Sequence, residues 1–174
     1  STLGWGYYEF RDSYVKTGQN DHIETILKYF NDYFMKCTFR NASGDVVAFC
    51  YQVGEGEIDH SYWNAPEIDE MKRKGFFLTA EKPQTDYVVA TAASLASAYL
   101  NFKATDAAYA DKCLDYAKAL FKFAQTNEKQ LSDNEDGPRS FIILQNGSMI
   151  IAGQECGFIW RQAILFILTR RLAF

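Results

Sequence analysis

The apolar residues of this chain recur at intervals of three and four, and this spacing constrains the fold more than any other feature. Between positions 21 and 34 the apolar side chains stand at Ile23, Ile26, Leu27, Phe30 and Phe34. This is the period of an α-helix that buries one stripe of its surface. Asp21, followed three residues later by Glu24, predicts a capping box at the start of that helix.

Two more stretches show the same helical spacing. Residues 5–16 carry several aromatic side chains and predict a helix that Gly18 ends. Asp106 is a good N-cap residue and predicts the start of another helix. The apolar face of that helix is expected to consist of Tyr109, Cys113, Tyr116, Ala117, Leu120, Phe121 and Ala124.

The middle of the chain combines a strand signal with one more helix signal. Val46–Val53 is rich in strand-forming residues and follows a turn-forming cluster at residues 41–45, which predicts a short strand or β-hairpin. An alanine-rich stretch after Pro83 predicts a long helix with Thr85 or Asp86 as its N-cap.

The connecting segments are polar and contain most of the remaining turn signals. We expect an ordered loop at residues 54–66, one short helix at residues 66–74 and a polar connection at residues 127–138. Long helices, longish loops and little strand indicate an all-α fold, in which paired helices bury their apolar stripes against one another.

Charge and cysteine spacing exclude several classes of partner. The formal net charge is -4 and no run of basic residues occurs, so nucleic acid is not an expected partner. No apolar run is long enough to span a bilayer, so no membrane partner is expected either. The four cysteines lack the spacing of a zinc or redox motif and are interpreted as small buried residues. A disulfide between Cys37 and Cys50 stays open.

Aromatic residues make up 16% of the chain, and one aromatic stretch is the most informative part of the sequence. Aromatic rings pack cores, and exposed rings also stack on the C–H faces of sugars. Residues 51–63 read YQVGEGEIDHSYW and are followed by NAPE. This stretch resembles the signature of glycoside hydrolase family 9, in which QVGDG is followed by DH, an aromatic pair and Pro-Glu. Residues 5–37 and 82–124 resemble early helices of the same family, and the resemblance runs from about residue 4 to residue 141.

The resemblance implies a fold and an activity. The fold is a fragment of an all-α (α/α)6 barrel, the six-hairpin toroid, with one short β-hairpin or strand. Family members hydrolyse β-1,4-glucans, mainly cellulose, with inversion, and use an Asp as general base and a Glu as general acid. By resemblance both lie outside this chain, so we expect no catalytic residue here and an inactive fragment. Glu57, Asp59 and Glu67 are interpreted as solvated or loop-ordering acids.

The same resemblance assigns substrate contacts to the aromatic stretch. It implies that His60 hydrogen-bonds sugar hydroxyls, that Trp63 is a stacking platform and that Tyr62 lines the cleft. The expected ligand is β-1,4-glucan or a cello-oligosaccharide, and the expected location is extracellular, with a signal peptide outside this fragment. The alternative for these residues is packing of the loop on the barrel. The alternative for the whole chain is a non-catalytic helical carbohydrate-binding or scaffold domain.

A calcium site of some family members is only partly matched. Those members carry PGSD with a Glu four residues after the Asp, whereas this chain has Pro83-Gln-Thr-Asp86 and Ala90 at the Glu position. The departure favours a helix cap over a metal site. A structural calcium stays open for the parent enzyme, and no other cofactor is expected.

The C-terminal part of the chain differs in composition from the rest. Residues 142–174 contain no Asp, Lys or Tyr and match nothing in the family. Codons allowed for this stretch, read in a shifted frame from Phe141, can encode a segment that resembles the family's next helix pair. Residues 1–141 are therefore interpreted as a partial catalytic domain and residues 142–174 as an out-of-frame tail.

Overall fold

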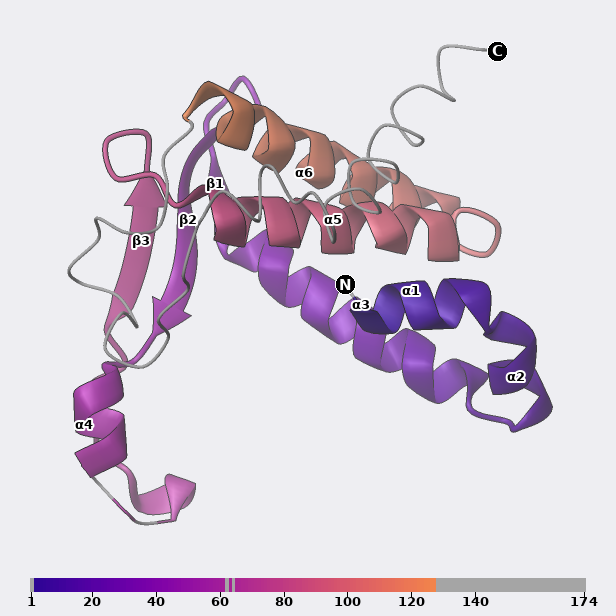
Figure 1. Cartoon of the computed structure of the whole chain (residues 1–174), viewed down its shortest axis with the longest axis horizontal. Helices are drawn as coiled ribbons and strands as arrows, with labels where there is room; N and C mark the ends of the chain where they lie inside the picture. Colours follow the sequence, from indigo (N-terminus) through magenta and orange to yellow (C-terminus); the bar gives the residue numbers. More distant parts are fainter. Residues whose placement is uncertain (1, 62, 64, 128–174) are drawn as a thin grey trace.

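The computed structural model of the chain describes residues 2–61, 63 and 65–127. Helices form one layer, and a small sheet packs at one end of it (Figure 1). The elements are, in order, α1 (Thr2–Glu9), α2 (Arg11–Lys16), α3 (Asn20–Lys36), β1 (Thr38–Arg40), β2 (Val46–Val53), α4 (Gly56–Ser61), the 3-10 helix η1 (Pro66–Ile68), β3 (Gly75–Thr79), α5 (Thr85–Phe102) and α6 (Ala107–Thr126).

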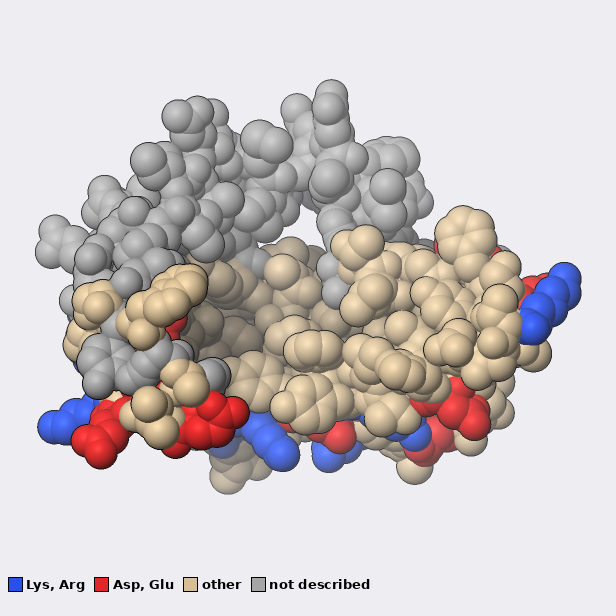
Figure 2. All heavy atoms as spheres, turned by 90° about the horizontal axis from the view of Figure 1, so that it is seen from below, with Lys and Arg blue, Asp and Glu red and all other residues tan. Residues whose placement is uncertain are grey.

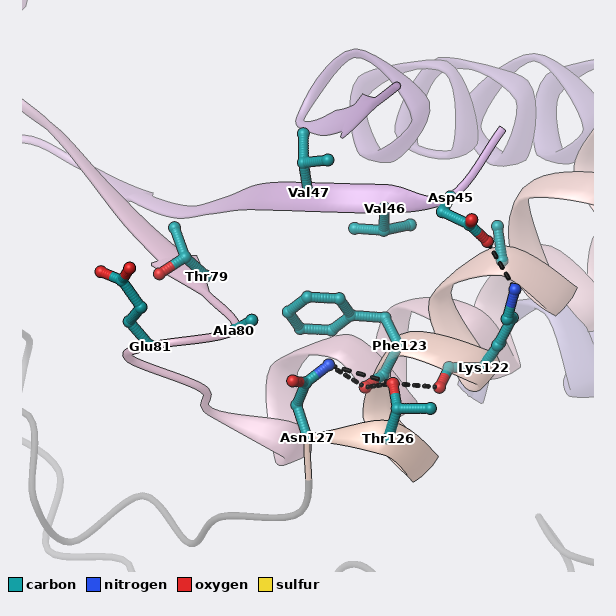
Figure 3. A pocket seen from close by; sticks show the side chains of 11 residues that line it. Asp45, Val46, Val47, Thr79, Ala80, Glu81, Lys122, Phe123, Thr126 and Asn127 are labelled. Atoms are coloured by element: carbon teal, nitrogen blue, oxygen red, sulfur yellow. Dashed lines mark hydrogen bonds and ion pairs between the residues drawn. The ribbon is translucent and has the colours of Figure 1, made fainter. Parts of the chain in front are cut away.

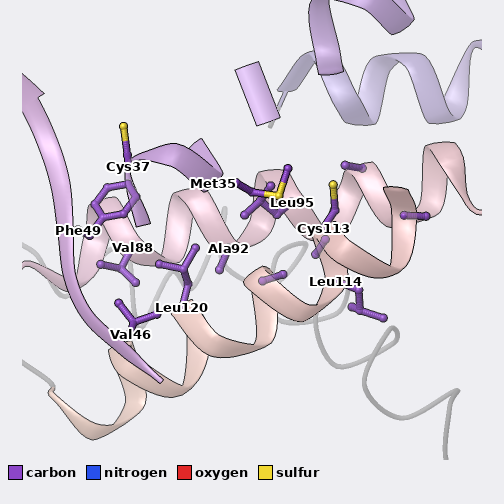
Figure 4. Close-up of a cluster of buried hydrophobic side chains, with 14 of the residues drawn as sticks. Met35, Cys37, Val46, Phe49, Val88, Ala92, Leu95, Cys113, Leu114 and Leu120 are labelled. Atoms are coloured by element: carbon purple, nitrogen blue, oxygen red, sulfur yellow. The ribbon is translucent and has the colours of Figure 1, made fainter. Parts of the chain in front are cut away.

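Helix α5 lies at the centre of the helical layer. It runs antiparallel to α6 on one side and packs against α1 and α3 on the other (Figure 1). Its buried alanines let the neighbouring helices approach closely, while Leu95 and Phe102 are completely buried between them. Figure 4 shows side chains from α3, β2, α5 and α6 meeting in one cluster. The predicted pairing of helices is thus confirmed.

The start of α6 follows the prediction. Asp106 is the N-cap, and its Oδ1 accepts a hydrogen bond from the Tyr109 backbone N–H at 3.2 Å. Tyr116 and Phe121, two members of the predicted face, are only half-buried at its edge. The buried face of α6 consists of Ala110, Cys113, Leu114, Ala117, Leu120, Phe123 and Ala124.

The N-terminal helices differ from the prediction in two ways. The single helix expected at residues 5–16 is broken at Phe10, so that α1 and α2 are separate. The N-cap of α3 is Gln19, which makes no side-chain capping bond, so the predicted capping box is wrong. The Glu24 carboxylate instead lies 2.5 Å from the hydroxyl of the buried Tyr7 and 3.4 Å from Arg11. The Glu24 carboxylate therefore binds residues of α1 and α2 and does not form the capping bond that the local motif predicts.

The three strands form one antiparallel sheet in the order β1-β2-β3. Thr38 pairs with Phe49, and Phe49 pairs with Leu78, so that Phe49 and Leu78 face the helical core. The predicted strand Val46–Val53 and the turn before it are confirmed. Strand β3 was not expected. The helix predicted at residues 66–74 is wrong, because only Pro66–Ile68 forms a short helical turn.

The start of α5 differs from the prediction, and the structure shows the state of two cysteines. The N-cap of α5 is Gln84, in an extended conformation and without a side-chain capping bond, rather than Thr85 or Asp86. Cys37 and Cys50, for which a disulfide stayed open, are both free thiols. Among the described residues, no helix is long and apolar enough to cross a bilayer.

Candidate functional site

The aromatic motif lies in the segment between β2 and β3, and hydrogen bonds close this segment at its base. Gly54 has a φ of +91°, a conformation that favours glycine. Its N–H donates to the Lys74 carbonyl at 2.8 Å, and its own carbonyl accepts from Gln52 Nε2 at 3.0 Å. Glu55 also pairs with Lys74 at 3.5 Å. The chain therefore leaves and re-enters the sheet at one point, and we call residues 54–74 the motif segment.

Helix α4 carries the motif away from the helical layer. In Figure 1 it projects beyond the end of the sheet, apart from α1, α3, α5 and α6. Its short turns are held by the Asp59 N–H donating to the Glu55 carbonyl at 2.9 Å and by the Ser61 hydroxyl donating to the Ile58 carbonyl at 2.8 Å. The expected ordered loop thus contains a helix of six residues.

The structure describes the three predicted substrate residues to different extents. His60 belongs to the last turn of α4, with its side chain outside the described part of the structure, and Tyr62 also lies outside it. Trp63 follows the helix, and its side chain is 102% exposed. His60 and Trp63 therefore share one projecting segment, and the described residues do not enclose Trp63 in a cleft.

Within the described part of the structure, the acidic side chains of the motif segment do not form a catalytic pair. Asp59 and Glu67 are both exposed to solvent, and the side chain of Glu57 lies outside the described part. Asp69 serves the backbone: its Oδ1 accepts from the Met71 N–H at 2.8 Å, while its Oδ2 pairs with Arg73. For Glu57, Asp59 and Glu67, the interpretation as solvated or loop-ordering acids stays a prediction.

An aromatic cluster that the sequence analysis did not single out supports the base of the motif. The Tyr51 ring on β2 lies 5.2 Å from the Tyr87 ring in the first turn of α5, with an interplanar angle of 32°. It also lies 6.4 Å from the Phe76 ring on β3. These three residues come from three elements, so no local periodicity could have revealed the contact.

The described residues around the start of α5 do not make up a calcium site. Gln84 is 2% exposed, and its Oε1 has no hydrogen-bond partner within the described structure, which leaves one buried oxygen for a cation. Calcium takes six to eight oxygen ligands, usually including carboxylates. Ala90 supplies none, and the described residues contain no group of three or more His, Cys, Asp or Glu that could hold a metal.

A hollow of about 580 Å³ lies at the opposite end of the sheet (Figure 3). Val46 and Phe123 form its apolar wall, while an ion pair of 2.6 Å between Asp45 and Lys122 stands beside it. Strand β2 begins here and ends at the motif segment, roughly 20 Å away at the rise of a β-strand. The hollow is therefore separate from the predicted substrate residues.

Comparison with solved structures identifies the architecture. The catalytic domain of CelT from Clostridium thermocellum is 61% identical with a TM-score of 0.80; the match covers 83% of this chain and 29% of that one. A cellulase of C. cellulolyticum is 34% identical with a TM-score of 0.76, over 96% of this chain and 35% of that one. These are (α/α)6 barrels, so the predicted fold class is confirmed and the chain is a part of such a barrel.

Curated relatives agree with the structural matches. Endoglucanase A of Bacillus pumilus is 36% identical over 76% of this chain and 19% of its own length. Endoglucanase B of Cellulomonas fimi is 36% identical over 75% of this chain and 12% of its own length. The chain thus spans about a fifth or less of these two relatives. Residues 1–143 match the model of Glycosyl hydrolase family 9. On this match and on the shared barrel architecture, the chain belongs to glycosyl hydrolase family 9.

Proposed function

We propose that this chain is part of a secreted enzyme that hydrolyses β-1,4-glucan with inversion, and that its motif segment contributes to the substrate cleft. The observation that carries the proposal is the position of the motif. It lies on a segment closed at its base by the Gly54–Lys74 hydrogen bond and presents an exposed tryptophan, Trp63. Three of the relatives named above are two endoglucanases and a cellulase, and that cellulase was also solved with cellobiose. These relatives give no support to the non-catalytic alternative.

The mechanism assigns binding rather than bond cleavage to this chain. A flat indole with both faces in solvent can stack on a glucose ring, and a stacking contact of this kind contributes about 1 kcal/mol. The rigid base formed by Gly54, Tyr51 and Tyr87 would hold the platform in position. By family resemblance, His60 would donate or accept a hydrogen bond at a sugar hydroxyl. The general base and general acid would come from parts of the enzyme outside this chain.

A hydrolysis assay tests whether this chain contributes substrate binding without bond cleavage. The purified 174-residue chain is incubated with carboxymethyl cellulose, and the release of reducing sugar is measured. We expect no release above the buffer blank. Release that is lost on Asp59→Asn or Glu67→Gln would overturn the proposal, because it would assign catalysis to the carboxylates interpreted as solvated.

A binding assay tests the cleft residues. Calorimetry with cellohexaose compares the chain with Trp63→Ala and with Tyr29→Ala, a matched control on α3 whose side chain is 70% exposed. Loss of one stacking contact of about 1 kcal/mol corresponds to roughly fivefold weaker binding for Trp63→Ala. The control should bind like the parent chain. Equal weakening by both variants would show non-specific adhesion to exposed aromatic rings and would contradict the assignment.

We also propose that residues 142–174, which lie outside the described residues, are an out-of-frame tail. Support comes from the composition of this stretch, because residues 142–174 contain no Asp, Lys or Tyr. Sequencing the source DNA in all frames is the test. We expect a single-base deletion near codon 141, and an intact frame that encodes residues 142–174 in independent isolates would overturn the proposal.

A further inference from the structure

Two cysteines stand directly opposite each other where α3 passes into the sheet. The register pairs Thr38 with Phe49 and Phe39 with Ala48, so the next pair along the same ladder is Cys37 with Cys50. The Cys50 N–H donates to the Cys37 carbonyl at 2.9 Å, which confirms this position. Directly opposite residues of an antiparallel pair project their side chains to the same face of the sheet. Both thiols are free in the structure.

The spacing of such a pair suits a disulfide. Hydrogen-bonded neighbours across an antiparallel ladder have Cα atoms about 5.5 Å apart, and disulfides span Cα distances of about 4.4–6.8 Å. The Cβ atoms must approach by about 1 Å. Both sides can supply this movement: Cys37 is the C-cap that follows α3, with a helical backbone conformation, and the register of β2 shifts directly after Cys50.

The two thiols differ in access to solvent. Cys50 is half-buried, and its strand partner Phe77 on β3 is 48% exposed, so this face of the sheet is open to small molecules. Cys37 is 6% exposed. Burial raises the pKa of the Cys37 thiol, which lowers its thiolate fraction at neutral pH. Cys50 is therefore the thiol that an external reagent reaches first.

We propose that Cys37 and Cys50 form a reversible cross-strand disulfide when the protein meets a low-molecular-weight disulfide such as oxidised glutathione. In the first step the Cys50 thiolate attacks one glutathione sulfur, forms a mixed disulfide and releases one reduced glutathione. In the second step the Cys37 thiolate attacks the Cys50 sulfur and releases the second reduced glutathione. Two protein thiols are oxidised and one glutathione disulfide is reduced, with both protons passing to the released thiols.

The crosslink would join the end of α3 to β2 and close the chain between residues 37 and 50. It would restrict the unfolded chain and so stabilise the folded one. Cys50 stands only a few residues before Gly54, where the motif segment begins. The crosslink would therefore fasten the strand that carries the motif to the helical layer. This inference does not depend on the proposed glucan cleft.

Peptide mapping tests the proposal on the whole 174-residue chain. Trypsin separates all four cysteines, because they fall in the peptides 37–40, 41–72, 113–118 and 140–161. The protein is incubated with oxidised glutathione under native conditions, blocked with iodoacetamide, digested and analysed by mass spectrometry without reduction. We expect peptides 37–40 and 41–72 as one linked species, 2 Da lighter than their sum, which dithiothreitol converts back into two free peptides. The oxidised protein should melt several degrees higher than the reduced protein.

Single-cysteine variants make the assignment specific. Cys50→Ser and Cys50→Ala should both abolish the linked species, whereas Cys113→Ser should leave it unchanged, because Cys113 is completely buried. Cys156→Ser should also leave it unchanged. The proposal is overturned if peptide 41–72 carries glutathione while peptide 37–40 stays alkylated, or if the linked species pairs Cys50 with Cys113 or Cys156. It is also overturned if only unfolded protein forms the Cys37–Cys50 link.

Discussion

The helical layer and the motif segment are held in place by different means. In the helical layer, Leu95 and Leu120 are completely buried between α5, α6 and the sheet. In the motif segment, Ile58 and Ile68 are 46% and 65% exposed and Trp63 is fully exposed. Each fully buried Leu side chain contributes about 1.5–3 kcal/mol relative to an exposed one. Stability therefore resides in the helical layer, while the family motif lies on a segment that contributes little to it.

The attachment of the motif segment explains how it can still have a defined position. Its base is tied by the Gly54–Lys74 hydrogen bond and by the Tyr51–Tyr87 ring contact. The Glu55–Lys74 ion pair is 38% and 59% exposed and therefore adds little. Segments with few buried contacts open locally at lower free energy than the core. Amide exchange should therefore be fast in residues 54–74 and slow in α5.

The largest effect is expected from a cavity in the helical layer. Leu95→Ala should lower the free energy of unfolding by about 2–5 kcal/mol, because it removes a completely buried side chain and leaves a cavity. Urea denaturation followed by circular dichroism measures this change. Leu95→Ile keeps the volume and should cost less than about 1.5 kcal/mol. If Leu95→Ala were no worse than Leu95→Ile, the core would not be the source of stability.

The second effect concerns the polar contacts between α1, α2 and α3. Tyr7→Phe should cost about 1.5–3 kcal/mol, because the buried hydroxyl loses its 2.5 Å hydrogen bond to the charged Glu24 carboxylate. Burial and the neighbouring Glu24 raise the pKa of Tyr7 in the folded state above its ordinary value of about 10. As the pH rises, Tyr7 therefore loses its proton in the unfolded state before it does so in the folded state. The contribution of Tyr7 to folding stability is fully present below about pH 10 and is lost as the pH rises above that value.

Urea denaturation at pH 9, 10 and 11 checks the sign of this pH dependence. The free energy of unfolding should fall with pH in the parent chain and fall less steeply in Tyr7→Phe. Some slope should remain, because burial also raises the pKa of Tyr109. An identical slope in the parent and in Tyr7→Phe would mean that the Tyr7 hydroxyl is solvated and is not held by Glu24.

The third effect tests the base of the motif segment. Gly54→Ala should cost about 1–2 kcal/mol, because φ is +91° there while no atom stands within 4 Å of the added Cβ. Gly6→Ala is a matched control, since its Cβ also meets nothing within 4 Å but the residue lies inside helix α1. The control should be stabilised by up to about 1 kcal/mol. Thermal denaturation measures both, and equal shifts of one sign would refute a strained turn at Gly54.

The smallest effect on stability is expected at the predicted sugar platform. Trp63→Ala should change the free energy of unfolding by less than about 0.5 kcal/mol, because the ring contacts little and is fully exposed. The same variant is expected to weaken cellohexaose binding. A loss of stability comparable to that of Leu95→Ala would show that Trp63 packs against the protein, and the contrast between the two regions would then fail.

Local patterns account for most of the helical layer. The periodicity of apolar residues predicts α3 and α6, and an alanine-rich stretch predicts α5. Asp106 is predictable as an N-cap because its bond to Tyr109 spans only three residues. Val46–Val53 was located from strand-forming residues alone. For the candidate site, the motif located His60 and Trp63 on one segment. It could not predict the exposure of Trp63, which depends on whether distant residues cover it.

The family, the order of the long helices and the position of the motif follow from residue patterns within single segments. Folding of the whole chain is what brings Glu24 to Tyr7 instead of capping α3, adds β3 to the sheet and sets Cys37 opposite Cys50. Each of these depends on partners distant in the sequence. Burial and hydrogen bonding between such partners outweigh local preferences of a fraction of a kcal/mol per residue. The spacing of residues within one segment cannot reveal these contacts, because the partners lie in other segments.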